Sequence, residues 1–199
     1  EGFVRGRRFL HPKLGFTFEA PPSFTLENTA EAVLGVREGG GQATRLDVVR
    51  VPAEQSLADY LRSGWIDNIE PASMENFEIN GLPAAGATAS GGEWTFRIYA
   101  VRFGSEVYRF IFAAKQLSPA ANREFRSAVA TFRRMTLREI RSAKPLRIRS
   151  VAVRAGDTVG GLAQRMALPG NKRERFLALN GMTSTDGLKP GSQVKLVVE

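Results

Sequence analysis

The sequence predicts an α+β protein in which an antiparallel sheet flanked by helices is followed by a small domain of strand, helix, helix and strand. Segments between Gly15 and Lys115 alternate apolar and polar residues, as half-buried strands do. Two segments with helical periodicity begin after Ser56 and Ser118, and each serine can cap the first turn. After Val151, a strand pattern, two short helical patterns and a closing strand pattern follow in order.

The first strands are separated by turn residues. Residues 15–19 alternate apolar and polar side chains, and the strand ends at Pro21-Pro22, because proline cannot donate a hydrogen bond to a strand ladder. Residues 32–37 and 45–51 lie on either side of a run of three glycines. This arrangement predicts a β-hairpin with a loose glycine turn.

A helix and two long strands are expected next. Ser56 precedes an apolar helical face that consists of Leu57, Tyr60, Leu61 and Trp65. The strands span residues 93–103 and 106–115 and are joined by Gly104-Ser105. Because the first of them is apolar on both faces, it is predicted to be a central strand that is covered on both sides.

The last helix of the first domain begins with Ser118 as its cap and Pro119 at its first position. Its apolar stripe consists of Ala121, Phe125, Ala128, Val129 and Phe132. The stripe predicts that the helix packs on the sheet. Four aromatic residues that could line a ligand groove lie on predicted apolar faces and are assigned to the core instead: Trp65, Trp94, Tyr99 and Phe110.

These elements divide the chain into a leader at residues 1–8, a sandwich domain at 9–137, a basic linker at 138–148 and a second domain at 149–199. The formal net charge is +8, and basic residues gather around the linker. We interpret this charge run as a solvated helix end and linker, although a patch for nucleic acid, anionic lipid or an anionic cell-wall polymer is the alternative. Nucleic acid is the less favoured partner, because no zinc-finger spacing or aromatic RNA-binding signature accompanies the charge.

The second domain opens with a strand that ends at a Gly156-Asp157 turn. Thr158 is expected to cap the first helix, and Asn171 is expected to cap a second helix with Phe176, Leu177 and Leu179 as its core. Gly181 is expected to end this helix, and a Lys-Pro-Gly-Ser turn leads into a strand able to pair with the first.

This order, with its Gly-Asp-Thr turn and Pro-Gly turn, resembles a LysM domain, a module that recognises N-acetylglucosamine polymers such as peptidoglycan and chitin. The resemblance implies a shallow sugar groove between two loops. Carried over by position, the groove residues are Ala155, Gly156, Asp157, Thr158 and Val159 in the first loop and Asn180, Gly181, Met182, Thr183 and Ser184 in the second. Gly160-Gly161, where the family usually has a bulky or polar pair, and the basic second helix depart from the pattern.

The order of elements in the first domain, opened by residues 11–18, resembles the PsbP/Mog1-like α-β-α sandwich. Residues 5–16 are similar to the region that follows the catalytic part of bacterial M48-family zinc metalloproteases. The resemblance implies a non-catalytic C-terminal accessory region of a secreted protease, in the bacterial periplasm or cell envelope. Its expected partners are the upstream protease domain, envelope proteins and peptidoglycan or another N-acetylglucosamine polymer.

Enzymatic chemistry is not expected in this chain. His11 is the single histidine, so a His-Glu-x-x-His zinc site cannot be assembled, and no Gly-x-Ser-x-Gly elbow or cysteine is present. We therefore predict no catalytic residue, metal ligand or cofactor here, and the zinc of such a protease would belong to an upstream catalytic domain. The chain begins at Glu1 without an initiator methionine, which suggests that more sequence precedes it.

Two other functions stay open at this point. The chain could be a stand-alone cell-envelope adaptor that acts through protein binding alone. It could also be a basic nucleic-acid-binding protein, whose affinity for DNA would fall steeply with salt.

Overall fold

The computed structural model describes residues 1–184 and 186–199. The chain divides into two compact units, residues 1–143 and residues 144–199, and each is described by itself below. The division falls inside the range predicted for the linker. No helix formed by the described residues is both long enough and apolar enough to span a bilayer.

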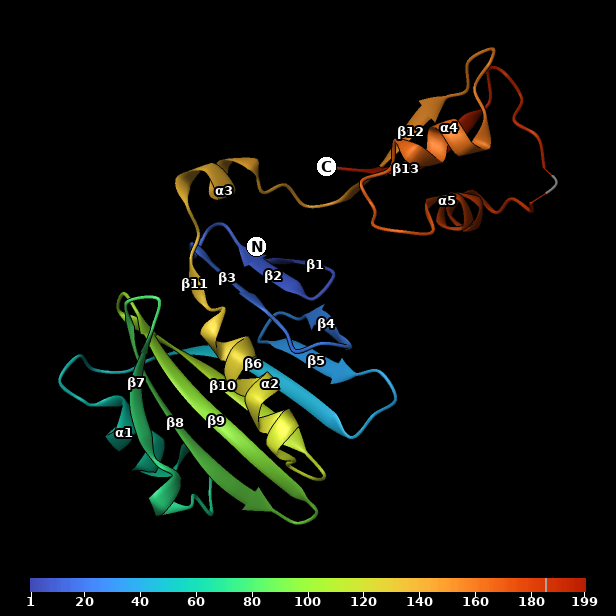
Figure 1. Cartoon of the computed structure of the whole chain (residues 1–199). Coiled ribbons are helices and arrows are strands. Elements are labelled where there is room, and N and C mark those ends of the chain that lie inside the picture. The colour runs from blue at the N-terminus through green and yellow to red at the C-terminus, as the bar shows by residue number, and fades with distance from the viewer. Residues whose placement is uncertain (185) are drawn as a thin grey trace. The chain divides into compact units, whose positions relative to one another are not determined.

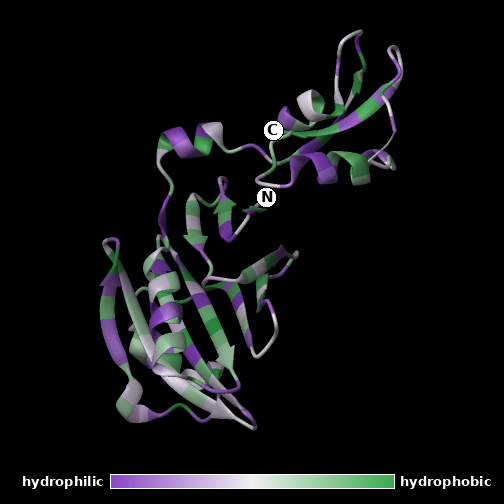
Figure 2. Cartoon of the chain, turned by 45° about the vertical axis from the view of Figure 1, so that its right-hand side comes forward, coloured by the Kyte–Doolittle hydropathy of each residue, from purple (hydrophilic) through white to green (hydrophobic). Residues whose placement is uncertain are grey.

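Residues 24–114 form a seven-stranded antiparallel sheet (Figure 1). Its strands in spatial order are β4 (Phe24–Asn28), β5 (Val33–Arg37), β6 (Gln42–Arg50), β10 (Glu106–Ala114), β9 (Trp94–Phe103), β8 (Leu82–Gly91) and β7 (Glu75–Ile79). Burial alternates along most of β6 and β10, as the sequence predicted, and residues of both kinds follow one another along these strands in Figure 2. A smaller sheet contains β1 (Phe3–Arg5), β2 (Arg8–His11), β3 (Phe16–Glu19) and β11 (Arg133–Arg134).

The two long strands β9 and β10 lie at the centre of the larger sheet. Tyr99 and Val101 on one face of β9 belong to the core cluster that includes helix α2 (Pro119–Ala130). Ile98 and Ala100 on the other face belong to a second cluster, which includes helix α1 (Leu57–Tyr60). The sheet therefore lies between helices on its two faces (Figure 1), and the predicted α-β-α sandwich is confirmed.

Helix α2 is stabilised both by the cap at its N-terminus and by the burial of its apolar stripe against the sheet. The Ser118 hydroxyl accepts a hydrogen bond from the Ala121 N–H at 3.0 Å, and a proline occupies the first turn. The Phe125 ring is fully buried and stacks on Phe112 of β10, with 4.9 Å between ring centroids. Every residue of the predicted stripe is buried: Ala121, Phe125, Ala128, Val129 and Phe132.

The first helical segment is shorter and more irregular than predicted. The Ser56 hydroxyl caps α1 by accepting from the Asp59 N–H at 3.1 Å. A π-helical turn, η1 (Leu61–Trp65), follows and contains Gly64 at φ 100°, and a 3-10 turn, η2 (Pro71–Ser73), precedes β7. The left-handed conformation of Gly64 interrupts this turn, after the α-helix has ended at Tyr60.

The predicted leader at residues 1–8 is wrong. β1 pairs with β2 in antiparallel register, so that Phe3 lies opposite Leu10. Gly6 adopts φ 60° in the turn between them, and the Arg7 guanidinium donates to Glu19 and to the Ala20 carbonyl, each at 2.6 Å. Glycine and arginine were interpreted as linker residues, whereas they form the turn of a hairpin and the ion pair that holds it.

The predicted linker at residues 138–148 is also mostly ordered structure. Helix α3 (Leu137–Ser142) occupies its first part, and strand β12 (Arg147–Ala152) begins before its end. Thr136 and Glu139 form a capping box, in which each side chain accepts from the other residue's N–H. Two hydrogen bonds from the Arg133 guanidinium, with the bond from the Thr136 N–H, lower the pKa of Glu139 to about 2.

The second unit has the predicted strand–helix–helix–strand order. β12 pairs with β13 (Gln193–Val198) in antiparallel register, and helices α4 (Val159–Gln164) and α5 (Lys172–Asn180) lie between them in the chain. The buried core consists of Val153, Leu162, Ala163, Met166, Phe176, Leu177, Val194 and Leu196. Leu179, predicted for this core, is only partly buried.

Asn171 does not cap α5 as predicted. It lies in the left-handed region at φ 42°, and its side chain makes no capping hydrogen bond. Its backbone carbonyl instead accepts from the Arg175 N–H at 3.0 Å. The left-handed conformation differs from the extended backbone of a usual N-cap, from which the side chain can reach the N–H groups of the first turn.

The capping box predicts a specific response to acid. Because the pKa of Glu139 is depressed in the folded protein, the stability it gives α3 is present above the ordinary value of 4.5 and is lost as the pH falls toward 2. An NMR titration of the Glu139 carboxyl carbon should therefore give a midpoint near 2. In Glu139→Gln, the amide signals of α3 should not respond in this range, and a wild-type midpoint at 4.5 would contradict the capping arrangement.

The Phe125 ring should be a main source of stability for the first unit. Phe125→Ala leaves a cavity between α2 and the sheet, and we expect it to lower the free energy of unfolding by about 3–5 kcal/mol. Chemical denaturation followed by tryptophan fluorescence measures this change. Arg123→Ala, at an exposed position on the same helix, is the matched control and should change stability by less than about 0.5 kcal/mol.

Candidate functional site

The loop after β12 is held by its own side chains. The Arg154 N–H donates to the Asp157 carboxylate at 2.8 Å, and the Asp157 N–H donates to the Arg154 carbonyl at 3.1 Å. Gly156 lies at φ 88°, which favours glycine, at the tip of this turn. The Thr158 hydroxyl accepts from the Gly161 N–H at 3.0 Å and so caps α4, as predicted.

The Gly160-Gly161 pair has a partial structural explanation. A Cβ atom at Gly161 would lie 3.1 Å from the Thr158 hydroxyl oxygen, which is tighter than most such contacts. A Cβ atom at Gly160 would meet nothing within 4 Å. Glycine at position 161 therefore leaves room for the Thr158 cap, whereas a side chain at position 160 would meet no neighbouring atom.

The loop after α5 begins with a left-handed helix end. Gly181 lies at φ 62°, and the Met182 N–H donates to the Leu177 carbonyl at 2.8 Å, which satisfies a carbonyl of the last turn. The Thr183 N–H donates to the Asp186 carboxylate at 2.6 Å, and this bond lowers the pKa of Asp186 below its usual range. Both loops are therefore stabilised by an aspartate that accepts from a backbone N–H three residues earlier.

Asn180 joins α5 to β13. Its side-chain amide donates to the carbonyls of Phe176 and Lys195 at 2.9 and 3.0 Å, and its oxygen accepts from the Lys195 N–H at 2.7 Å. These bonds engage its side-chain oxygen and nitrogen within the domain. Asn180, one of the predicted groove residues, therefore has a structural role in the second loop. A ligand would contact the residues next to it.

The two loops meet at Val153. The Val153 N–H donates to the Ser192 carbonyl and the Gly191 N–H donates to the Val153 carbonyl, each at 2.8 Å. Because Val153 leads into the first loop and Gly191-Ser192 ends the second, these bonds join the start of one loop to the end of the other. The structure therefore links the start of the first loop to the turn at residues 189–192.

A surface pocket follows the second loop. It is lined by Asn180, Met182, Asp186, Gly187, Leu188, Lys189, Ser192, Gln193 and Val194. Of the ten predicted residues, Asn180 and Met182 line it, and none of the first-loop residues does. The pocket is linked to the start of the first loop only through Ser192, whose carbonyl accepts from the Val153 N–H. The sequence analysis missed Leu188 and Ser192, although the Lys-Pro-Gly-Ser turn, which follows Leu188 and ends at Ser192, was a signal.

Backbone groups and apolar side chains are what these loops offer to a ligand. In the part of the chain that the structure describes, Ala155 and Gly156 take part in no hydrogen bond, and both are exposed. Met182 and Leu188 are partly buried against the core and keep part of their apolar surface exposed. Since Asp157, Thr158 and Asn180 are engaged internally, recognition here would depend on backbone N–H and C=O groups.

The family comparison identifies this unit. Residues 151–197 match the family model of the LysM domain. The second unit contains a LysM domain. The match begins within β12, covers both helices and both loops described above, and ends within β13.

Comparison with curated proteins finds no sequence match. Among solved structures, one from Bacteroides thetaiotaomicron is similar at 13% identity and a TM-score of 0.51, over 94% of this chain. The present chain covers 65% of that structure, so it spans slightly less than two thirds of its length. This similarity shows a shared fold and nothing more.

Cyanobacterial PsbP (CyanoP) from Synechocystis is also similar, at 12% identity and a TM-score of 0.48, over 64% of this chain and 91% of CyanoP. The sandwich architecture of the first unit is seen directly in its strand order and in the helices on its two faces.

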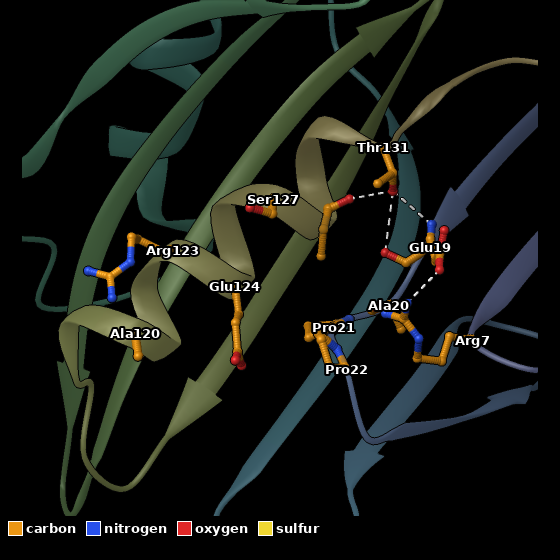
Figure 3. Close-up of a pocket in the computed structure, with 11 residues that line it drawn as sticks. Arg7, Glu19, Ala20, Pro21, Pro22, Ala120, Arg123, Glu124, Ser127 and Thr131 are labelled. Carbon is orange, nitrogen blue, oxygen red and sulfur yellow. Dashed lines mark hydrogen bonds and ion pairs between the residues drawn. The ribbon is translucent and has the colours of Figure 1, made fainter.

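The first unit has a pocket that the sequence did not predict. It lies between α2 and the Pro21-Pro22 segment, and Figure 3 shows Arg123, Glu124 and Ser127 along the helix side. The polar groups at one end are engaged, since Arg7 pairs with Glu19 and the Thr131 hydroxyl accepts from the Glu19 N–H at 2.7 Å. Its lining comes from three separate segments, so no local pattern could have indicated it.

The described residues also contain no group of three or more His, Cys, Asp or Glu that could hold a metal ion.

Asn180 should be needed for the stability of the LysM domain. Asn180→Ala removes the hydrogen bonds that link the end of α5 to Lys195 of β13, so we expect a loss of about 1–3 kcal/mol in the unfolding free energy of the domain. Hydrogen exchange of the β13 amides in the full chain measures it. Ser184→Ala, an exposed residue of the same loop, is the control and should leave exchange unchanged. Equal protection in both variants would contradict the role assigned to Asn180.

Proposed function

We propose that this chain attaches to an N-acetylglucosamine polymer, with peptidoglycan as the main candidate, through its LysM domain. The observation that carries the proposal is the LysM match over residues 151–197. It is supported by the two loops, which are joined at Val153 and leave the backbone of Ala155 and Gly156 without hydrogen-bond partners in the described chain. Fold alone does not carry function, so the exposed backbone of the first loop and the pocket beside the second loop are a second support.

In the proposed complex, the acetamido group of one sugar lies against the two loops. Its N–H and C=O bond to backbone groups of Ala155 and Gly156, and its methyl group contacts the exposed parts of Met182 and Leu188. Each such hydrogen bond contributes about 0.5–1.5 kcal/mol, so a single sugar is bound weakly. A polymer presents many copies of the same group, and repeated sites raise the effective concentration near the wall.

We propose a non-catalytic role for the first unit, in which it serves as an interaction module beside the LysM domain. The resemblance of residues 5–16 to the region after the catalytic part of M48-type metalloproteases supports an accessory role in a secreted protease. Under that proposal, the catalytic zinc belongs to a domain upstream of this chain. A periplasmic or cell-envelope location follows from the proposed wall ligand.

A stand-alone envelope adaptor is the second candidate for the whole protein. The observation that favours it is the pocket between α2 and the Pro21-Pro22 segment, which offers apolar walls to a protein partner. The upstream reading frame separates the two candidates, since a His-Glu-x-x-His helix before Glu1 supports the protease and its absence supports the adaptor.

Glycan binding is tested by titrating the ¹⁵N-labelled full chain with chitotetraose and recording amide shifts. We expect shifts concentrated at residues 155–159 and at the lining of the second loop. Ala155→Leu places a larger side chain in the first loop, beside Gly156, and should weaken binding at least fivefold. Ala178→Leu, at an exposed position on α5, is the matched control and should bind like the wild type. No shifts at millimolar sugar would contradict the proposal.

A further inference from the structure

The positive charge of the protein is concentrated in its second unit. Residues 144–199 contain ten basic and four acidic side chains, so this unit has a formal net charge of +6, whereas the whole chain has +8. In the first unit many arginines are paired with carboxylates, as in Arg7–Glu19, Arg109–Asp47 and Arg133–Glu139. Many basic side chains of the first unit therefore form ion pairs within the protein, which leaves less of its positive charge available to a ligand.

Three arginines of the LysM domain surround one pocket. Arg149 lies on β12, Arg154 follows the end of that strand, and Arg165 follows α4. The rest of the lining consists of Ser150, Val151, Ala152, Leu196 and Val198. No carboxylate lines the pocket, and within the described residues none of the three guanidinium groups forms an ion pair or side-chain hydrogen bond.

The arginine pocket adjoins the proposed sugar groove. Arg154 directly precedes Ala155, and its N–H is the donor that holds Asp157 in the first loop. Neighbouring Cα atoms are about 3.8 Å apart, so a ligand seated at Ala155 lies within reach of the Arg154 side chain. A polymer bound at the first loop can therefore extend into the arginine pocket.

We propose that the Arg149–Arg154–Arg165 pocket binds carboxylate groups attached to the glycan, which makes the domain select peptidoglycan over neutral chitin. The inference rests on the proposed function and names its substrate class. Peptidoglycan carries carboxylates on its peptides, and the planar guanidinium group binds a carboxylate through two parallel hydrogen bonds. Unpaired arginines around a partly apolar floor are suited to such a group.

Nucleic acid fits this surface less well. Proteins that bind single-stranded nucleic acid commonly add aromatic side chains on which bases stack. Phe176 is the single aromatic residue of residues 144–199, and its ring is fully buried in the core. The pocket lining contains no aromatic side chain. The pocket therefore offers charge without a stacking surface.

The test compares two ligands of equal sugar number with the full chain: chitotetraose, and a peptidoglycan fragment of four sugars that retains its peptides. Isothermal titration calorimetry should give at least tenfold tighter binding of the peptidoglycan fragment. Arg149→Gln/Arg154→Gln/Arg165→Gln should abolish this preference and leave chitotetraose affinity unchanged, which also shows that the variant is folded. Lys172→Gln/Arg173→Gln/Arg175→Gln on α5 removes the same charge and should keep most of the preference. Arg149→Gln alone, at an exposed strand position, should reduce it in part.

The outcomes separate this inference from the proposed function. Equal affinity of the wild type for both ligands would overturn the inference and leave glycan binding intact. Equal losses in the two triple variants would also overturn it, because the effect would then be general attraction. Tighter binding of a DNA duplex that is lost in the first triple variant would assign the pocket to nucleic acid. Binding of the peptidoglycan fragment alone, through the arginines, would support the pocket and contradict the neutral-sugar groove.

Discussion

The proposed site depends on two hydrogen bonds between Val153 and the Gly191-Ser192 turn. They continue the β12–β13 pairing beyond the ends of both strands, so the first loop starts where the second one ends. Gly191 lies at φ 87°, a conformation that favours glycine and gives the turn its shape. Loss of these bonds would remove the backbone link between the start of the first loop and the end of the second.

Local signals in the sequence predicted local structure well. Ser118, Thr158 and Gly181 each occupy the cap position that their chemistry predicted, because capping depends on a few neighbouring residues. Prediction was wrong where distant segments decide the outcome. Strand β1 is only three residues long and is defined by its pairing with β2, and the Arg7–Glu19 ion pair that holds this hairpin joins residues 12 positions apart.

The candidate site shows the same division between local and distant information. The first loop has a signature that the sequence reveals, namely a glycine turn followed by a capping threonine. The pocket beside the second loop, the arginine pocket and the pocket in Figure 3 each combine separate segments. Asn180 resembled a ligand contact by position, yet its amide holds α5 to β13. Polar residues of the loops mostly hold the loops themselves, which leaves recognition to the backbone and to the unpaired arginines.

The most direct test of this account is co-sedimentation with purified, insoluble peptidoglycan. The full chain should pellet with the polymer in a saturable manner and be displaced by soluble peptidoglycan fragments, whereas a protein of residues 1–143 should stay in the supernatant. Retention of the full chain in the supernatant, or equal pelleting of residues 1–143, would contradict the assignment of wall binding to the LysM domain.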